Sequence, residues 1–120
     1  MKKVLIVDDD SNIVLSLDFL LRKAGYTVLI ARDGEEAIES IETHRPLLVV
    51  LDIRMPKVDG FGVVQYLKSK PLFKQIKIII LSAKGRDADI ERAASLGVDQ
   101  YMLKPFSTRT LLANIQLLLA

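Results

Sequence analysis

The stretch Val4-Leu5-Ile6-Val7-Asp8-Asp9-Asp10 joins four apolar residues directly to three acidic residues. A short apolar run rich in β-branched side chains is typical of a strand that is buried on both faces of a sheet. The carboxylates at its exit would crowd together, and like charges raise one another's pKa unless a positive charge offsets them. A divalent cation that prefers oxygen ligands, Mg²⁺ or Ca²⁺, is a suitable partner. Taken alone, the stretch fits solvated acids and one helix cap equally well.

Strand-like and helix-like segments alternate along the whole chain. We expect strands at residues 3–7, 26–31, 47–51, 76–81 and 100–103. The first helix is expected to bury Ile13, Leu17, Leu20, Leu21 and Ala24, and further helices to begin near residues 33, 59, 87 and 107. Five successive βα units predict an α/β fold with a doubly wound parallel sheet, because crossovers between parallel strands are right-handed.

The composition limits the class of protein. The 120 residues fit one domain, residues 1–120, and a half-hydrophobic content with 27% charged residues excludes a disordered chain. A net charge of +2 without a basic cluster argues against nucleic-acid binding by this segment, and the absence of cysteine excludes thiol chemistry. No apolar run approaches the ~20 residues that span a bilayer, and no signal peptide is visible. We therefore expect a cytoplasmic protein.

Polar residues at the strand ends are the candidate site, because ligands bind outside the carboxyl ends of the strands in such sheets. The first strand is followed by Asp8 and Asp9, the third by Asp52, the fourth by Ser82 and the fifth by Lys104. Carboxylates beside one ammonium group suit a phosphoryl group held by a metal ion. An aspartate can act as the nucleophile and form an acyl phosphate, while the lysine and serine contact the phosphoryl oxygens.

Four stretches at these positions resemble the response-regulator receiver domains of two-component signalling systems. They are VDDD (7–10), LDIRMPKVDG (51–60), LSA (81–83) and GVDQYMLKPF (97–106), in the order of the family. The resemblance implies the flavodoxin-like (βα)5 receiver fold with strand order 2-1-3-4-5. It also implies a regulatory phosphoacceptor, not an enzyme with turnover, that receives a phosphoryl group from a sensor histidine kinase or a histidine phosphotransfer protein.

The resemblance implies a role for each acidic residue. Asp52 would accept the phosphoryl group and share in binding Mg²⁺. Asp9 would bind the metal ion directly, and Asp8 would act mostly through bound water. The main-chain carbonyl of Arg54 would complete the protein's ligands, and Lys104 would bind the phosphoryl oxygens.

The resemblance also implies a switch. Ser82 would move toward the phosphoryl group, and Tyr101 would rotate into the vacated space. The peptide bond between Lys104 and Pro105 would be cis. The surface that changes would comprise the helix near residues 87–97, the strand at 100–103 and the helix after residue 107. An output domain or a target protein would bind there.

Two other interpretations stay open. A phosphatase fragment of the haloacid dehalogenase type also carries Asp-x-Asp after its first strand, but here Ser11-Asn12 replaces the expected Gly-Thr. A receiver-like interaction domain without phosphorylation is disfavoured because every site residue is present. Arg54 and Lys84 each lie two residues beyond a site residue, so we expect both to flank the phosphoryl entrance and to attract anionic donors. The sequence leaves open whether the chain is a fragment of a longer protein.

Overall fold

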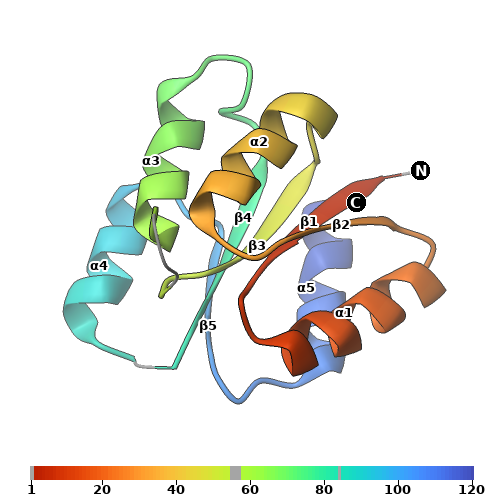
Figure 1. The fold of residues 1–120 in the computed structure, drawn as a ribbon. Coiled ribbons are helices and arrows are strands. Elements are labelled where there is room, and N and C mark those ends of the chain that lie inside the picture. The colour runs from red at the N-terminus through yellow and green to blue at the C-terminus, as the bar shows by residue number, and fades with distance from the viewer. Residues whose placement is uncertain (1, 55–57, 84) are drawn as a thin grey trace.

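The computed structural model describes residues 2–54, 58–83 and 85–120. These residues form β1 (Lys3–Val7), α1 (Ser11–Lys23), β2 (Thr27–Ala31), α2 (Gly34–His44), β3 (Leu48–Asp52), α3 (Gly60–Ser69), β4 (Lys77–Ser82), α4 (Asp87–Ser95), β5 (Gln100–Leu103) and α5 (Thr108–Leu118). The strands form one parallel sheet in the order β2-β1-β3-β4-β5, with helices on both faces (Figure 1). The predicted doubly wound α/β fold and its strand order are confirmed.

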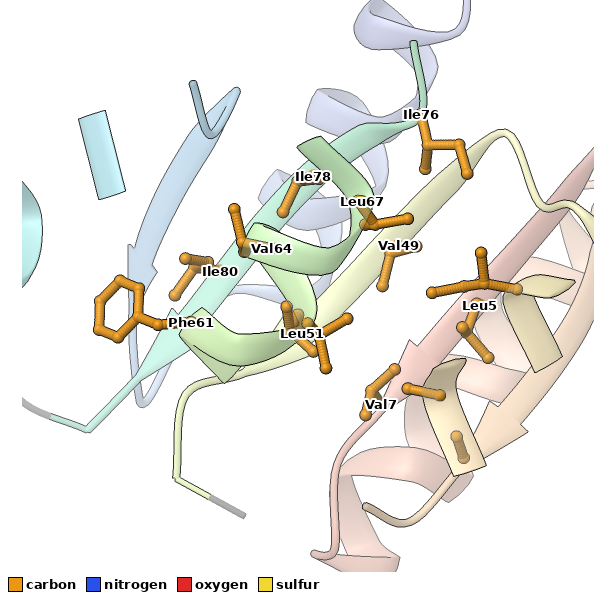
Figure 2. Close-up of a cluster of buried hydrophobic side chains, with 14 of the residues drawn as sticks. Leu5, Val7, Val49, Leu51, Phe61, Val64, Leu67, Ile76, Ile78 and Ile80 are labelled. Carbon is orange, nitrogen blue, oxygen red and sulfur yellow. The ribbon is translucent and has the colours of Figure 1, made fainter. Parts of the chain in front are cut away.

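Two buried clusters hold the helices against the sheet. On one face, Leu5 and Val7 of β1 belong to a cluster with side chains of α2, α3 and α4 (Figure 2). On the other face, Val4 and Ile6 belong to a cluster with side chains of α1 and α5. Burial of each such side chain contributes about 1.5–3 kcal/mol relative to exposure. Because neighbouring residues of a strand point to opposite faces, a strand covered on both sides needs apolar residues at every position.

Side-chain caps mark the starts of four helices. Asp10, Asp33, Asp59 and Ser107 each accept a hydrogen bond from a backbone amide in the first turn of α1, α2, α3 and α5, respectively. Such caps satisfy amides that have no partner inside the helix. Gly25 follows α1 with a φ of +96°, in keeping with the stop that the sequence predicts there.

The buried face of α1 differs from the prediction. Val14, Leu17 and Leu21 are buried, whereas Ala24 is an exposed C-cap residue. Ile13 is only half-buried. Helical spacing fits either Ile13 or Val14, and only the way in which α1 lies on the sheet decides between them.

Two polar residues lie inside the sheet, although the sequence predicted them just beyond it. β3 ends at Asp52 and β4 at Ser82, one residue later than expected. In the register of the sheet, Asp52 is opposite Leu81 and Ser82 is opposite Leu103. The sheet backbone therefore fixes the positions of both residues.

Among the helices of residues 2–54, 58–83 and 85–120, none has the length and the apolar character needed to cross a membrane.

Candidate functional site

Three carboxylates meet at the carboxyl ends of two adjacent strands. Asp8 and Asp9 follow β1, Asp52 ends β3, and the pairing of Val7 with Leu51 brings these strand ends side by side. Each carboxylate offers an oxygen atom within 4.8 Å of the others. Asp8 and Asp52 are buried, whereas Asp9 is exposed. The sequence-based grouping of these acids is thus present in space.

Lys104 reaches this group from the end of β5. Its Nζ lies 3.1 Å from Oδ2 of Asp8 and 3.5 Å from Oδ2 of Asp52. Its backbone amide donates to the carbonyl of Ser82 at 2.7 Å, and its peptide bond to Pro105 is cis, as the family resemblance implies. One ammonium group is therefore shared by two buried carboxylates.

Backbone amides hold the other oxygens of the two buried carboxylates. The amide of Asp10 donates to Oδ1 of Asp8 at 2.9 Å. The amide of Arg54 donates to Oδ1 of Asp52 at 3.3 Å. Each buried carboxylate thus has an amide on one oxygen and Lys104 on the other, which fixes its orientation.

The electrostatics of the site leave Asp52 short of positive charge. Burial raises the pKa of Asp52, and the nearby charge of Asp8 raises it further; Lys104 and the amide of Arg54 oppose this only in part. Burial alone would lower the pKa of Lys104, but the charges and hydrogen bonds of Asp52 and Asp8 outweigh it, so that its pKa is raised. An additional cation among the carboxylates would stabilise the ionised form of Asp52.

The donor set fits a hard divalent cation. Three carboxylates converge, and the described part of the site contains neither cysteine nor histidine. Mg²⁺ prefers one or two carboxylates and retains several waters, so an exposed ligand such as Asp9 beside buried Asp52 is compatible with it. The chemistry of these residues therefore suits Mg²⁺ better than Zn²⁺.

Ser82 and Tyr101 lie on the same face of the sheet. Ser82 is buried at the end of β4 and follows the strand alternation of Ile78 and Ile80. Tyr101 of β5 pairs with Ile80, is half-buried, and packs against the cluster that α2, α3 and α4 cover. The two side chains are therefore placed on the side of α4.

Val58, in the segment between β3 and α3, packs tightly against the start of α2. A Cβ atom at Gly34 would lie only 2.0 Å from the carbonyl oxygen of Val58. This close approach fixes the position of Val58, which lies in the same segment between β3 and α3 as Arg54. The contact was not predicted from the sequence, although a glycine directly after the capping residue Asp33 is the signal that could have indicated it.

Arg54 is exposed and lines a pocket together with Asp9. That it flanks a phosphoryl entrance stays a prediction. Lys84, to which the sequence gave a similar role, lies outside the described residues. Two further arginines of the same pocket, Arg86 and Arg92, were missed because nothing in the sequence relates α4 to the loop after β3.

Comparison with known proteins gives consistent results. The sequence model "Response regulator receiver domain" matches residues 4–116. The alkaline phosphatase synthesis transcriptional regulatory protein PhoP of Bacillus subtilis is 42% identical over 98% of this chain and 48% of that protein. The probable transcriptional regulator ycf27 of Cyanophora paradoxa is 46% identical over the same shares. The chain thus spans about half the length of these curated relatives.

Solved structures agree in fold. A putative response regulator of Chloroflexus aurantiacus superposes with a TM-score of 0.91 at 32% identity, over 98% of this chain and 97% of that chain. The chemotaxis response regulator CheY4 of Vibrio cholerae gives a TM-score of 0.91 at 30% identity, over 98% of both chains.

Proposed function

Because this chain belongs to the family of response regulator receiver domains, we propose that Asp52 accepts a phosphoryl group in a Mg²⁺-dependent reaction. The donor would be a sensor histidine kinase or a histidine phosphotransfer protein. The chain would act as a regulatory phosphoacceptor that promotes only its own phosphorylation and dephosphorylation. Residues 1–120 would serve as one receiver domain in the cytoplasm, where the ATP that charges a histidine kinase is available.

The position of Asp52 supports its role as the acceptor. Among the three carboxylates it is the one that lies at the end of β3, between Asp8 and the β4 strand that carries Ser82. A carboxylate oxygen of Asp52 would attack phosphorus, and the bond from phosphorus to the donor's imidazole nitrogen would break. The electron pair stays on the imidazole, and an acyl phosphate remains on Asp52.

The surrounding residues would share the work of binding. Asp9, Asp52 and the main-chain carbonyl of Arg54 would hold Mg²⁺, with Asp8 acting mostly through water. The ion would offset charge on the phosphoryl oxygens during transfer. Lys104, which already contacts both buried carboxylates, would shift its ammonium group toward those oxygens.

The signal would pass to the surface of α4, β5 and α5. Ser82 would donate its hydroxyl to a phosphoryl oxygen, and Tyr101 would follow into the space behind it. Both residues lie on the face of the sheet next to α4, which supports this coupling. An output domain or a separate target would recognise the altered surface.

Intact-mass measurement after incubation with acetyl phosphate and Mg²⁺ tests the proposal. We expect one phosphoryl adduct, which is absent without metal and absent in Asp52→Asn. Borohydride reduction converts an aspartyl phosphate to homoserine, so peptide mass spectrometry identifies the acceptor. Homoserine at position 8 would instead support a haloacid dehalogenase-type phosphatase, and no adduct under any condition would support an interaction domain without phosphorylation.

A further inference from the structure

A pocket of about 590 Å³ opens next to the carboxylates, between the β3–α3 loop and α4. Asp9 and Arg54 belong both to its wall and to the candidate site. Arg86 and Arg92 contribute two more guanidinium groups from the start and the middle of α4. A ligand group in this pocket would therefore lie beside a phosphoryl group at Asp52.

The guanidinium groups of this pocket form no close ion pair with the described carboxylates. Within the described part of the chain, no ion pair within 4.0 Å joins Arg54, Arg86 or Arg92 to a carboxylate. Three aspartates share this wall: Asp9 belongs to the carboxylate group of the site, Asp59 accepts the Gly62 amide at 2.9 Å as the cap of α3, and Asp89 lies on α4. The formal charges of the wall therefore balance, but the guanidinium donors of Arg86 and Arg92 are not held by a carboxylate of the described residues.

Arg92 is held in place by an aromatic ring. Its Cζ lies 4.3 Å from the ring centroid of Phe61, which is itself buried. Stacking of a guanidinium group on a ring orients its planar set of donors and reduces the entropy that binding would cost. Arg92 is thus prepared to bind a planar anion such as a carboxylate in a bidentate manner.

We propose that Arg86 and Arg92 bind a second acidic group of the phosphodonor, a carboxylate close to the phosphoryl group that Asp52 receives. The inference rests on the proposed function and specifies its substrate class. The carboxylate can belong to a small acyl phosphate or to an acidic side chain next to the phosphohistidine of a donor protein. In the small-molecule case, the Asp52 oxygen–phosphorus bond forms, the acyl oxygen–phosphorus bond breaks, and the acid leaves as a carboxylate with the electron pair.

A pair of matched donors tests the pocket. We would compare 4-carboxybenzoyl phosphate with 4-carbamoylbenzoyl phosphate, which differ only in the distal carboxylate, and measure adduct formation by intact mass at saturating Mg²⁺. The quantity compared is the rate with the carboxy donor divided by the rate with the carbamoyl donor. At low salt this ratio should be about fivefold lower in Arg86→Ala/Arg92→Ala than in the parent chain. A larger change is not expected, because contacts between exposed charges are weak. Added salt should reduce the ratio in the parent chain, since the Debye length is about 10 Å at 0.1 M.

Two control variants separate charge from folding. Arg109→Ala removes an exposed arginine of α5 outside the pocket and should leave the ratio unchanged. Arg86→Lys/Arg92→Lys keeps the charge and should retain part of the preference. Acetyl phosphate, which has no second acidic group, measures the effect of each variant on the phosphoryl site itself, so that the preference is read only from the ratio of the two benzoyl donors.

A second pair of donors distinguishes the two possible sources of the carboxylate, a small acyl phosphate and a donor protein. Short phosphohistidine peptides with glutamate or glutamine beside the phosphohistidine provide the protein-like arm. A preference seen only with the benzoyl donors assigns the pocket to small molecules, and one seen only with the peptides assigns it to donor proteins. Equal ratios in the parent and in Arg86→Ala/Arg92→Ala with both pairs would overturn the inference, whereas the lack of any adduct would overturn the proposed function itself.

Discussion

Replacement of Gly34 by alanine should disturb the candidate site from a distance. Gly34 is the first residue of α2, and a Cβ atom there would lie 2.0 Å from the carbonyl oxygen of Val58 and 2.6 Å from its Cβ. The obstructing atoms belong mainly to backbone, so no side-chain rotation relieves the contact. The β3–α3 loop would have to move away from α2.

The size of the displacement follows from these distances. Ordinary van der Waals contact begins at 3.4 Å, so the Val58 carbonyl has to retreat by roughly 1.4 Å. The loop that carries Val58 also carries Arg54, whose amide bonds Asp52 and whose carbonyl is a proposed metal ligand. Mg²⁺ tolerates little departure from octahedral geometry. We expect a loss of about 10–100-fold in Mg²⁺ affinity, as for other changes in the residues that orient metal ligands.

The free energy of unfolding of Gly34→Ala should fall only moderately, because two opposing effects partly cancel. Overpacking costs about 1–3 kcal/mol, while alanine in place of glycine favours a helix by up to about 1 kcal/mol. Isothermal titration with Mg²⁺ and thermal unfolding of the metal-free chain measure the two effects separately.

Gly62→Ala is the matched control for Gly34→Ala. A Cβ atom at Gly62, in the first turn of α3, would meet the Val58 side chain at 2.7 Å and the capping oxygen of Asp59 at 3.6 Å, and among the described residues it would meet no backbone atom of the loop. Its effect on Mg²⁺ affinity should be small. Unchanged affinity in Gly34→Ala, or an equal loss in both variants, would refute the idea that contact with α2 positions the loop.

Three further predictions concern charged and polar groups. Asp52→Asn should make the metal-free protein more resistant to urea at neutral pH. Burial and Asp8 raise the pKa of Asp52, so the contribution of this group to the stability of the parent is fully present below the unfolded value of 3.8 and is lost as pH rises through the raised pKa. An unchanged urea midpoint in Asp52→Asn would contradict this. Lys104→Met should lower the free energy of unfolding in urea by about 3–5 kcal/mol, because Asp8, which is 1% exposed, loses its cationic partner. A loss below about 1 kcal/mol would show that the amide of Asp10 is enough to stabilise the buried carboxylate of Asp8. Tyr66 should ionise at a pKa of about 12 in an absorbance titration, because its hydroxyl donates a hydrogen bond to Glu42. The contribution of this bond to stability is therefore present below pH 10.0 and is lost as pH rises through about 12. Glu42→Gln should remove the shift in the pKa of Tyr66.

The periodicity of the sequence predicts the fold because the sheet is buried on both faces. Continuous apolar runs such as Val4 to Val7 are typical of a strand covered by helices on both sides. Aspartate caps such as Asp33 and Asp59 mark the starts of the helices. The choice between Ile13 and Val14 on α1 was not predictable, since adjacent helical positions differ by about 100° and either fits the apolar face.

The site residues at the strand ends could be predicted from the sequence for a similar reason. In a parallel sheet, all carboxyl ends lie at one edge, so Asp8, Asp52 and Lys104 can be assigned to one place without coordinates. The individual contacts could not be assigned in this way. Lys104 bridges Asp8 and Asp52, and backbone amides bind the other oxygens of these two carboxylates. Whether such contacts form depends on differences in interatomic distance of a few tenths of an ångström, which no sequence pattern specifies.

The sequence by itself determined the order of strands and helices, the acidic edge of the sheet and the presence of one lysine there, because each depends on local patterns and on the rules of parallel sheets. Only the tertiary structure decided that Gly34 supports the loop after β3 and that Arg86 and Arg92 face the same pocket as Arg54. These residues belong to segments far apart in the chain, and no local pattern encodes how the segments pack. Their relation is set by side-chain packing among α2, α3 and α4, which exists only once the chain has folded.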